Sequence, residues 1–170
     1  MTDQPADHHA RPTVRLRPVE PADLDAWFEH QRDADANRMA AFGAVDPSDR
    51  AAFDARWALI LAHPAVVIRT ILADGEVAGS ILRWRDEALD APEVSYWLGR
   101  GWWGRGIATA ALRAFLDLVA DRPLYGRAAS TNPASRRVLE HAGFRLVRVD
   151  EGVAATDGRL VDEAILRLDG

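Results

Sequence analysis

The segment that spans residues 93–120 constrains the fold of this chain more than any other part of the sequence. Residues 93–98 (EVSYWL) are rich in β-branched and aromatic side chains, a composition typical of a strand. The next eight residues, 99–106 (GRGWWGRG), contain four glycines. From 107 to 120 apolar side chains recur on one face of a predicted helix. A strand, a glycine-rich loop and a helix in this order predict an α/β domain with a helix N-terminus that is open to an anion.

Strands and helices alternate along the rest of the chain. Asp74-Gly75 and Asp157-Gly158 predict tight turns between pairs of strands. Asp46-Pro47 and Asn132-Pro133 predict helix starts, because a side-chain acceptor precedes a proline. Leu24, with the aromatic residues that follow it, indicates one further helix. The predicted strands cover residues 13–17, 66–73, 77–84, 93–98, 124–129, 144–149 and 161–168.

Composition narrows the possible chemistry. The chain has 170 residues and no cysteine, and all 21 of its basic residues are arginine. These absences exclude disulfides, thiolate zinc sites, a cysteine nucleophile and a lysine Schiff base. No cluster of carboxylates shows the spacing of metal ligands, so no metal is expected.

Length and charge set the expected class of protein. We expect residues 1–12 to form a flexible tail and residues 13–170 to form one domain. The net charge of −5, with no basic block, argues against a nucleic-acid partner. No apolar run is long enough to cross a membrane, so a cytoplasmic protein is the expectation.

The glycine-rich loop alone does not identify a ligand. Gly101, Gly104 and Gly106 are spaced GxxGxG, whereas dinucleotide sites use GxGxxG, and no acidic residue follows at the next strand to hold a ribose. A Walker loop is excluded because the chain has no lysine.

A second motif follows one strand later, at residues 132–144 (NPASRRVLEHAGF). With residues 96–99 (YWLG) and 104–108 (GRGIA), it resembles the GNAT superfamily of acyl-CoA-dependent N-acyltransferases. The likeness is greatest to the branch that acetylates the N-termini of ribosomal proteins, which residues 15–18 (RLRP) and Asp23 also resemble. The resemblance implies the acyl-CoA N-acyltransferase fold, an α/β (α+β) domain whose mixed, mainly antiparallel central sheet is flanked by helices and splays to admit acetyl-CoA.

The resemblance also implies acetyl-CoA as co-substrate. Main-chain amides of the loop would hold the pyrophosphate, and the pantetheine arm would lie along the strand edge like an added strand. Relatives often carry Gln or Arg where this chain has Trp103, so the first phosphate contact departs from the family pattern. The implied cofactor-binding residues are Tyr96, Trp97, Leu98, Trp103, Gly104, Arg105, Gly106, Ile107, Ala108, Thr109, Asn132 and Ser135.

The implied reaction is attack of a neutral amine on the thioester in a ternary complex. At pH 7 about one-tenth of an α-amine is neutral, whereas a lysine-type amine is almost entirely protonated. Glu93 is the candidate base, if burial raises its pKa. In many relatives a tyrosine acts as the acid that protonates the leaving thiolate, and this chain has Leu139 at that position. We therefore expect Ser135 to protonate the thiolate instead.

The sequence leaves the acceptor open. It would be a protein N-terminus or a small cationic amine, and Trp27, Phe28 and Phe42 are expected to line its pocket. One of the loop residues Trp102 and Trp103 is expected to line either the acceptor pocket or the contact of a homodimer. Two alternatives stay open at this point, a non-catalytic acyl-CoA-binding or sensing domain and a nucleotide-binding regulatory domain.

Overall fold

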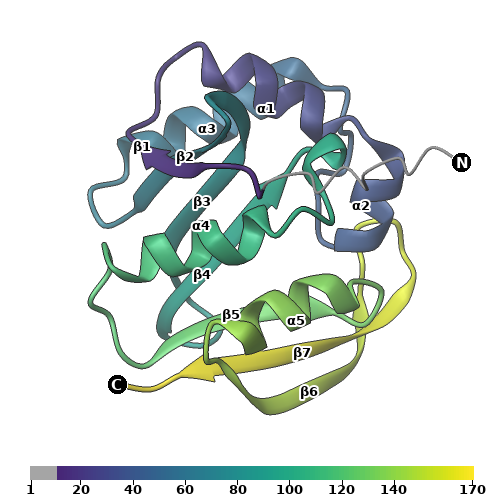
Figure 1. Cartoon of the computed structure of the whole chain (residues 1–170). Coiled ribbons are helices and arrows are strands. Elements are labelled where there is room, and N and C mark those ends of the chain that lie inside the picture. The colour runs from purple at the N-terminus through teal and green to yellow at the C-terminus, as the bar shows by residue number, and fades with distance from the viewer. Residues whose placement is uncertain (1–10) are drawn as a thin grey trace, which may run out of the picture.

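A computed structural model describes residues 11–170, so most of the predicted tail lies outside the described part of the chain. The strands form one seven-stranded sheet in the order β1-β2-β3-β4-β5-β7-β6 (Figure 1). Every neighbouring pair is antiparallel except β4 and β5, which are parallel. This is the mixed, mainly antiparallel sheet that the motifs imply. The elements are β1 (Val14–Arg17), α1 (Asp23–Gln31), α2 (Ala34–Ala40), α3 (Arg50–Ala62), β2 (Val67–Ala73), β3 (Glu76–Asp86), β4 (Ala91–Leu98), a 3-10 turn η1 (Arg100–Trp102), α4 (Ile107–Leu116), β5 (Leu124–Ala129), α5 (Pro133–His141), β6 (Arg145–Ala154) and β7 (Leu160–Leu168).

The main hydrophobic core lies between the sheet and helices α4 and α5, which run across the front of the sheet in Figure 1. Ile107, Leu112 and Phe115 of α4 are fully buried there, on the face that the apolar spacing predicts. A smaller aromatic cluster lies on the opposite face, where α1 and α3 pack against β2 and β3. Its buried members are Trp27, Phe28 and Phe53.

Strands β4 and β5 separate soon after they begin. Glu93 pairs with Tyr125, and this is the one register pair between the two strands. On its other side β4 stays paired with β3 from Ala91 to Leu98. Beyond Glu93, therefore, one edge of β4 has no strand partner among the described residues, and the gap opens toward the N-termini of α4 and α5.

Several predicted boundaries shift. The turn at Asp74-Gly75 is present, with positive φ angles at both residues. Helix α3 begins at Arg50 under an Asp49 cap, and not at the predicted Asp46-Pro47 start, because Asp46 instead accepts hydrogen bonds from Ser48. The helix predicted to reach residue 120 ends at residue 116, and strand β6 runs five residues beyond its predicted end at 149.

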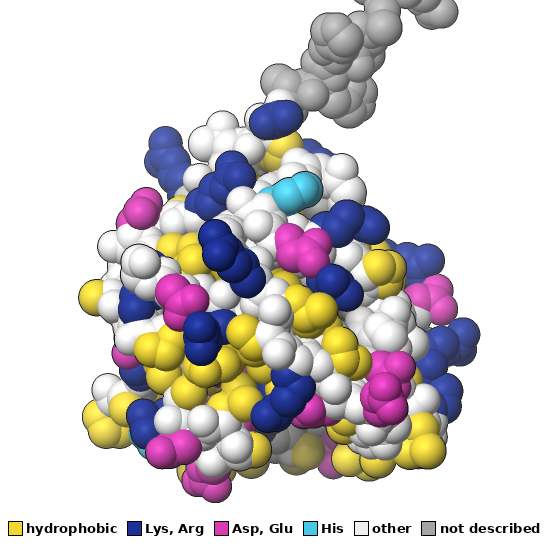
Figure 2. All heavy atoms as spheres, turned by 90° about the horizontal axis from the view of Figure 1, so that it is seen from below, with side chains coloured by type: hydrophobic (Ala, Val, Ile, Leu, Met, Phe, Trp, Pro, Cys, Tyr) yellow, Lys and Arg dark blue, Asp and Glu magenta, His cyan; other side chains and the backbone are white. Residues whose placement is uncertain are grey.

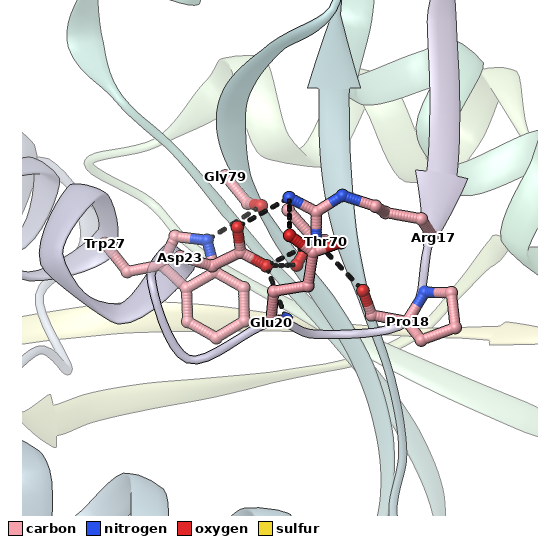
Figure 3. Close-up of polar contacts among 7 residues, drawn as sticks. All are labelled: Arg17, Pro18, Glu20, Asp23, Trp27, Thr70 and Gly79. Carbon is pink, nitrogen blue, oxygen red and sulfur yellow. Dashed lines mark hydrogen bonds and ion pairs between the residues drawn. The ribbon is translucent and has the colours of Figure 1, made fainter.

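A buried ion pair joins β1, α1 and β2. The Asp23 carboxylate is 2% exposed and accepts two hydrogen bonds from the Arg17 guanidinium, at 2.6 and 2.7 Å (Figure 3). Thr70 donates to it from β2, and the Glu20 backbone N–H completes the set. The motif likeness at residues 15–18 and Asp23 thus corresponds to a fully bonded carboxylate that fixes where α1 starts.

Charges on the surface are mixed. Acidic and basic side chains alternate with apolar ones on the face shown in Figure 2. The outer strand β6 exposes Leu146, Val147 and Val149. Among the described residues, no helix is long and apolar enough to cross a membrane.

Candidate active site

The N-terminus of α4 opens into a cavity of about 500 Å³, here named the Gly106 cavity. Gly104 and Gly106 both have left-handed φ angles, of 71° and 76°. Gly106 caps α4 without any side-chain hydrogen bond, so the first N–H groups of the helix face the cavity unpaired. Apart from the neighbouring residues in the chain, no atom of residues 11–170 lies within 4 Å of where a Cβ would stand at either glycine, so an anion can approach the backbone closely. The residues present therefore fit a pyrophosphate.

Side chains of the loop are already engaged. Trp103 lines the Gly106 cavity, but its indole N–H donates to Leu98 O at 3.0 Å and its backbone N–H to Arg100 O. Its two donors are thus used within the protein. Arg105 stacks on Trp102 at 5.1 Å and lies 3.6 Å from Asp74 of the β2–β3 turn. The positive charge beside the glycines is held near the loop rather than buried.

A second cavity, also of about 500 Å³, lies over the opposite face of the sheet and is here named the Glu93 cavity. Five residues line both cavities, namely Ala40, Tyr96, Trp97, Asn132 and Ser135, and the last four come from β4 and from the start of α5, beside the gap between β4 and β5. Helix α2 borders both cavities through Ala40. The two cavities therefore adjoin where the strands part, so that two different molecules could meet there.

Four charged side chains from four strands meet in the Glu93 cavity. Arg127 of β5 lies 2.6 Å from Asp86 of β3, 3.0 Å from Glu93 of β4 and 3.6 Å from Glu163 of β7. One guanidinium thus serves three carboxylates. Glu93 is only 6% exposed, and its Oε2 has no hydrogen-bond partner among the described residues despite the short ion-pair distance.

This environment sets the proton affinity of Glu93. Burial raises its pKa to about 7, Arg127 opposes the rise, and Asp86 and Glu163 add to it. Burial likewise raises the pKa of Glu163. A carboxyl group with a pKa near 7 in a cavity can accept a proton at physiological pH.

Two hydroxyl groups meet between the cavities. The Tyr96 hydroxyl lies 2.8 Å from Ser135 Oγ, and either atom can donate. Burial raises the pKa of Tyr96 to about 12, so this hydroxyl keeps its proton at neutral pH. Asn132 caps α5 by accepting from the Ser135 backbone N–H at 3.0 Å, and it lines both cavities as well. Asn132 is therefore both the N-cap of α5 and a lining residue of the two cavities.

Leu139, at the position where relatives carry a tyrosine, points into the core. It is 1% exposed and lies against β5, where a Cβ on Gly126 would come within 2.6 Å of it. Tyr96 thus places a phenol near the cavities from a strand rather than from the last helix.

The expected acceptor-lining residues fall in different places. Trp27 and Phe42 line the Glu93 cavity. Phe28 is buried beside Phe53, with ring centroids 5.3 Å apart, and is not among the side chains that line the cavity. Within residues 11–170, no group of three or more His, Asp or Glu side chains is arranged to hold a metal ion.

Comparison with known proteins identifies the family. Residues 13–145 match the acetyltransferase (GNAT) domain, and the chain belongs to this family. A search of curated proteins finds no matching sequence.

Solved structures with the same fold include several acetyltransferases. RimJ of Mycobacterium smegmatis, solved with CoA-disulfide, is 27% identical with a TM-score of 0.75, over 92% of this chain and 82% of that one. RimL, a ribosomal L7/L12 α-N-protein acetyltransferase solved with coenzyme A, is 20% identical with a TM-score of 0.75, over 92% and 94%. The immunity acetyltransferase MccE, solved with acetyl-CoA and AMP, is 19% identical with a TM-score of 0.72, over 92% of each chain. The neighbour RimJ, at 27% identity, is consistent with the branch that the motifs resemble, and RimL shares the fold.

Three charged residues of the site were not foreseen from the sequence, namely Asp86, Arg127 and Glu163. Helix α2, which borders both cavities, was also missed. Its sequence (ADANRMA) has no apolar period, and the helix forms on an Asp33 cap and ion pairs from Arg100 to Asp33 and Asp35. The Asp33 cap was the one signal that could have marked it.

Proposed function

We propose that this chain transfers an acetyl group from acetyl-CoA to a primary amine by direct attack in a ternary complex. The observation that carries the proposal is the meeting of two cavities at the β4–β5 gap, with the buried Glu93 in one of them and the open α4 N-terminus in the other. Acetyl-CoA supplies the activated acyl carbon as a thioester. The acceptor is a protein N-terminal α-amine or a small cationic amine.

In this proposal the α4 amides at residues 107–109 and the glycine backbone bind the pyrophosphate. The free edge of β4 at Tyr96–Leu98 receives the amide arm. Arg105 exchanges Asp74 for a phosphate, since its ion pair with Asp74 is long and exposed. These contacts place the thioester near the β4–β5 gap.

Protons move through three groups of the chain, namely the Glu93 carboxyl and the hydroxyls of Ser135 and Tyr96. Glu93 takes a proton from the amine, so that nitrogen forms its bond to the acyl carbon as the carbon–sulfur bond breaks. Ser135 Oγ gives a proton to the departing thiolate and takes one from the Tyr96 hydroxyl, 2.8 Å away. Tyr96 then regains a proton from solvent, and Glu93 releases to solvent the proton that it took from the amine. A thiolate leaves more readily than an alkoxide, so the missing helix tyrosine does not preclude turnover.

The alternative of a non-catalytic acyl-CoA-binding domain would be favoured by an exposed Glu93. Glu93 is instead buried with a pKa near 7, as a base for this reaction needs. We therefore favour the enzyme. Its activity can be assayed through the coenzyme A thiol that acetyl transfer releases from acetyl-CoA.

The experiment measures thiol release with a panel of amines, alongside acetyl-CoA affinity by calorimetry. We expect release with at least one amine and about 100-fold lower kcat in Glu93→Gln, at unchanged acetyl-CoA affinity. Tight acetyl-CoA binding without release from any amine would overturn the enzyme proposal. Equal kcat in Glu93→Gln and the parent would remove the assignment of the base.

A further inference from the structure

The Glu93 cavity has one aromatic end. Its wall on the α1 and α3 side carries rings from Trp27, Phe53 and Trp57, and Trp84 of β3 continues the wall. Trp27 and Trp57 lie 4.8 Å apart by ring centroids, and Phe53 and Trp57 lie 6.0 Å apart. Trp84 is 37% exposed, so ring surface remains open to whatever fills the cavity.

Three side-chain donors on this end are already used within the protein, whereas the acceptor Asn37 Oδ1 has no hydrogen-bond partner among the described residues. Trp27 Nε1 donates to Gly79 O at 3.1 Å (Figure 3). Gln31 Nε2 donates to Pro47 O at 3.2 Å, and Asn37 Nδ2 donates to Asp33 O at 2.9 Å. A bound peptide would bring a series of backbone N–H and C=O groups, and with its side-chain donors engaged this wall pairs few of them, at a cost in affinity. A bound molecule whose main part carries no such polar groups therefore fits this wall better.

The other end of the cavity is acidic. Glu93 and Glu163 are 6% and 7% exposed, and Arg127 is the one cation that contacts them and Asp86 among the described residues. Three carboxylates with one guanidinium leave negative charge to be balanced, which favours a cationic group. Asp86 lies two residues beyond Trp84 on β3, so the acidic end adjoins the aromatic wall.

We propose that the acceptor is a small primary amine with an aromatic or other apolar ring as its body. The ring lies against Trp27, Trp57 and Trp84, and the ammonium group points to Glu93 and Asp86. This inference rests on the proposed function, since it places the amine where acetyl transfer occurs. It selects the small cationic amine over the protein N-terminus.

The test compares acceptors of different chemistry with the full chain. Thiol release from acetyl-CoA is measured with 2-phenylethylamine, tryptamine, 1,4-diaminobutane and a tripeptide amide that begins with serine. We expect kcat/KM at least about tenfold higher for the two ring amines, from burial of the ring against indoles. A preference for the peptide or the diamine overturns the inference and leaves the acetyltransferase proposal intact. Release with none of the four, together with intact acetyl-CoA binding, counts against the proposed function itself.

A variant pair locates the ring. Trp84→Ala is expected to raise KM for 2-phenylethylamine about tenfold and to leave KM for ethylamine unchanged, and Trp84→Phe is expected to restore the parent value. Leu59→Ala, on the exposed side of α3, serves as the matched control and keeps the parent KM. Binding of 2-phenylethylamine by calorimetry provides a second readout without turnover. The same KM and affinity in Trp84→Ala and the parent would contradict the placement.

Discussion

The protonation state of Glu93 depends on Asp86 of the adjacent strand and on Arg127 and Glu163, which lie far from it in the sequence. Arg127 favours its charged form, whereas burial and the carboxylates of Asp86 and Glu163 favour its neutral form. A base must be deprotonated to act, so activity should rise with pH as Glu93 loses its proton near pH 7.

Removing one neighbour should shift this profile in a known direction. In Asp86→Asn a carboxylate that raises the pKa of Glu93 is lost, so the acid limb of kcat/KM should move to lower pH. In Arg127→Gln the opposing cation is lost, and the limb should move to higher pH. Opposite shifts of the acid limb in the two variants are expected only from the charges, because a merely structural defect has no reason to move the limb in opposite directions. A shift in the same direction in both variants would contradict the arrangement.

Glu93 should also reduce stability at high pH. Its pKa in the fold lies above its ordinary value, so the folded state holds a proton that the unfolded chain has released between about pH 4.5 and about pH 7. Stability therefore falls as pH rises through this window. Thermal unfolding of Glu93→Gln should show a gain in Tm over the parent at pH 8 that vanishes near pH 5. A gain of equal size at both values would exclude this cause.

The glycine loop offers a matched pair of substitutions at the start of α4. Gly106 has a φ of 76°, whereas Gly101 does not have a positive φ, and a Cβ added at Gly101 would meet no atom of the described residues within 4 Å beyond its chain neighbours. Gly106→Ala strains the backbone by about 1 kcal/mol and shifts the amides that face the cavity, so the Kd for acetyl-CoA should rise about tenfold.

Gly101→Ala is the control, and its Kd should match the parent value. Calorimetry with acetyl-CoA distinguishes the two variants. Equal affinities for both would mean that the α4 N-terminus does not hold the ligand.

The start of α1 depends on one buried carboxylate. Burial alone would raise the pKa of Asp23, but hydrogen bonds from Arg17, Thr70 and the Glu20 backbone hold it below its ordinary value. Its contribution is therefore present at neutral pH and is lost as pH falls through the lowered pKa. Asp23→Asn should cost about 3 kcal/mol in urea unfolding at pH 7, and less in acid.

The control for this prediction lies two residues away. Asp25 is exposed and pairs with Arg50 at the surface, so Asp25→Asn should change the unfolding free energy by less than about 0.5 kcal/mol. A comparable loss in both variants would show that the helix, and not the buried pair, is sensitive.

The sequence predicts those parts of the molecule whose signals are local. The apolar stripe of α4, the turn at Asp74-Gly75 and the cap of α5 at Asn132 are each encoded within a few residues, and the structure has all three. Helix α2 has no such stripe, its cap Asp33 lies just before it, and its ion-pair partner Arg100 lies in η1, far away in the sequence.

The charge cluster could not be predicted for a different reason. Asp86 and Glu93 lie on adjacent strands joined by a short turn, but Arg127 and Glu163 join them only through the strand order β4-β5-β7. Single-sequence patterns do not specify that order. Motif resemblance indicated the fold and left these contacts unknown, since they belong to this chain's own residues.

Seen as a whole, the molecule is a sheet whose parted strands connect two cavities, and acetyl transfer at that gap is the central proposal. The most direct test follows thiol release from acetyl-CoA with the most active acceptor of the amine panel between about pH 5.5 and about pH 9. The parent should show an acid limb near pH 7, and Glu93→Gln should be about 100-fold slower without that limb. Identical rates and profiles for parent and variant, or bound acetyl-CoA that is never turned over, would contradict the account.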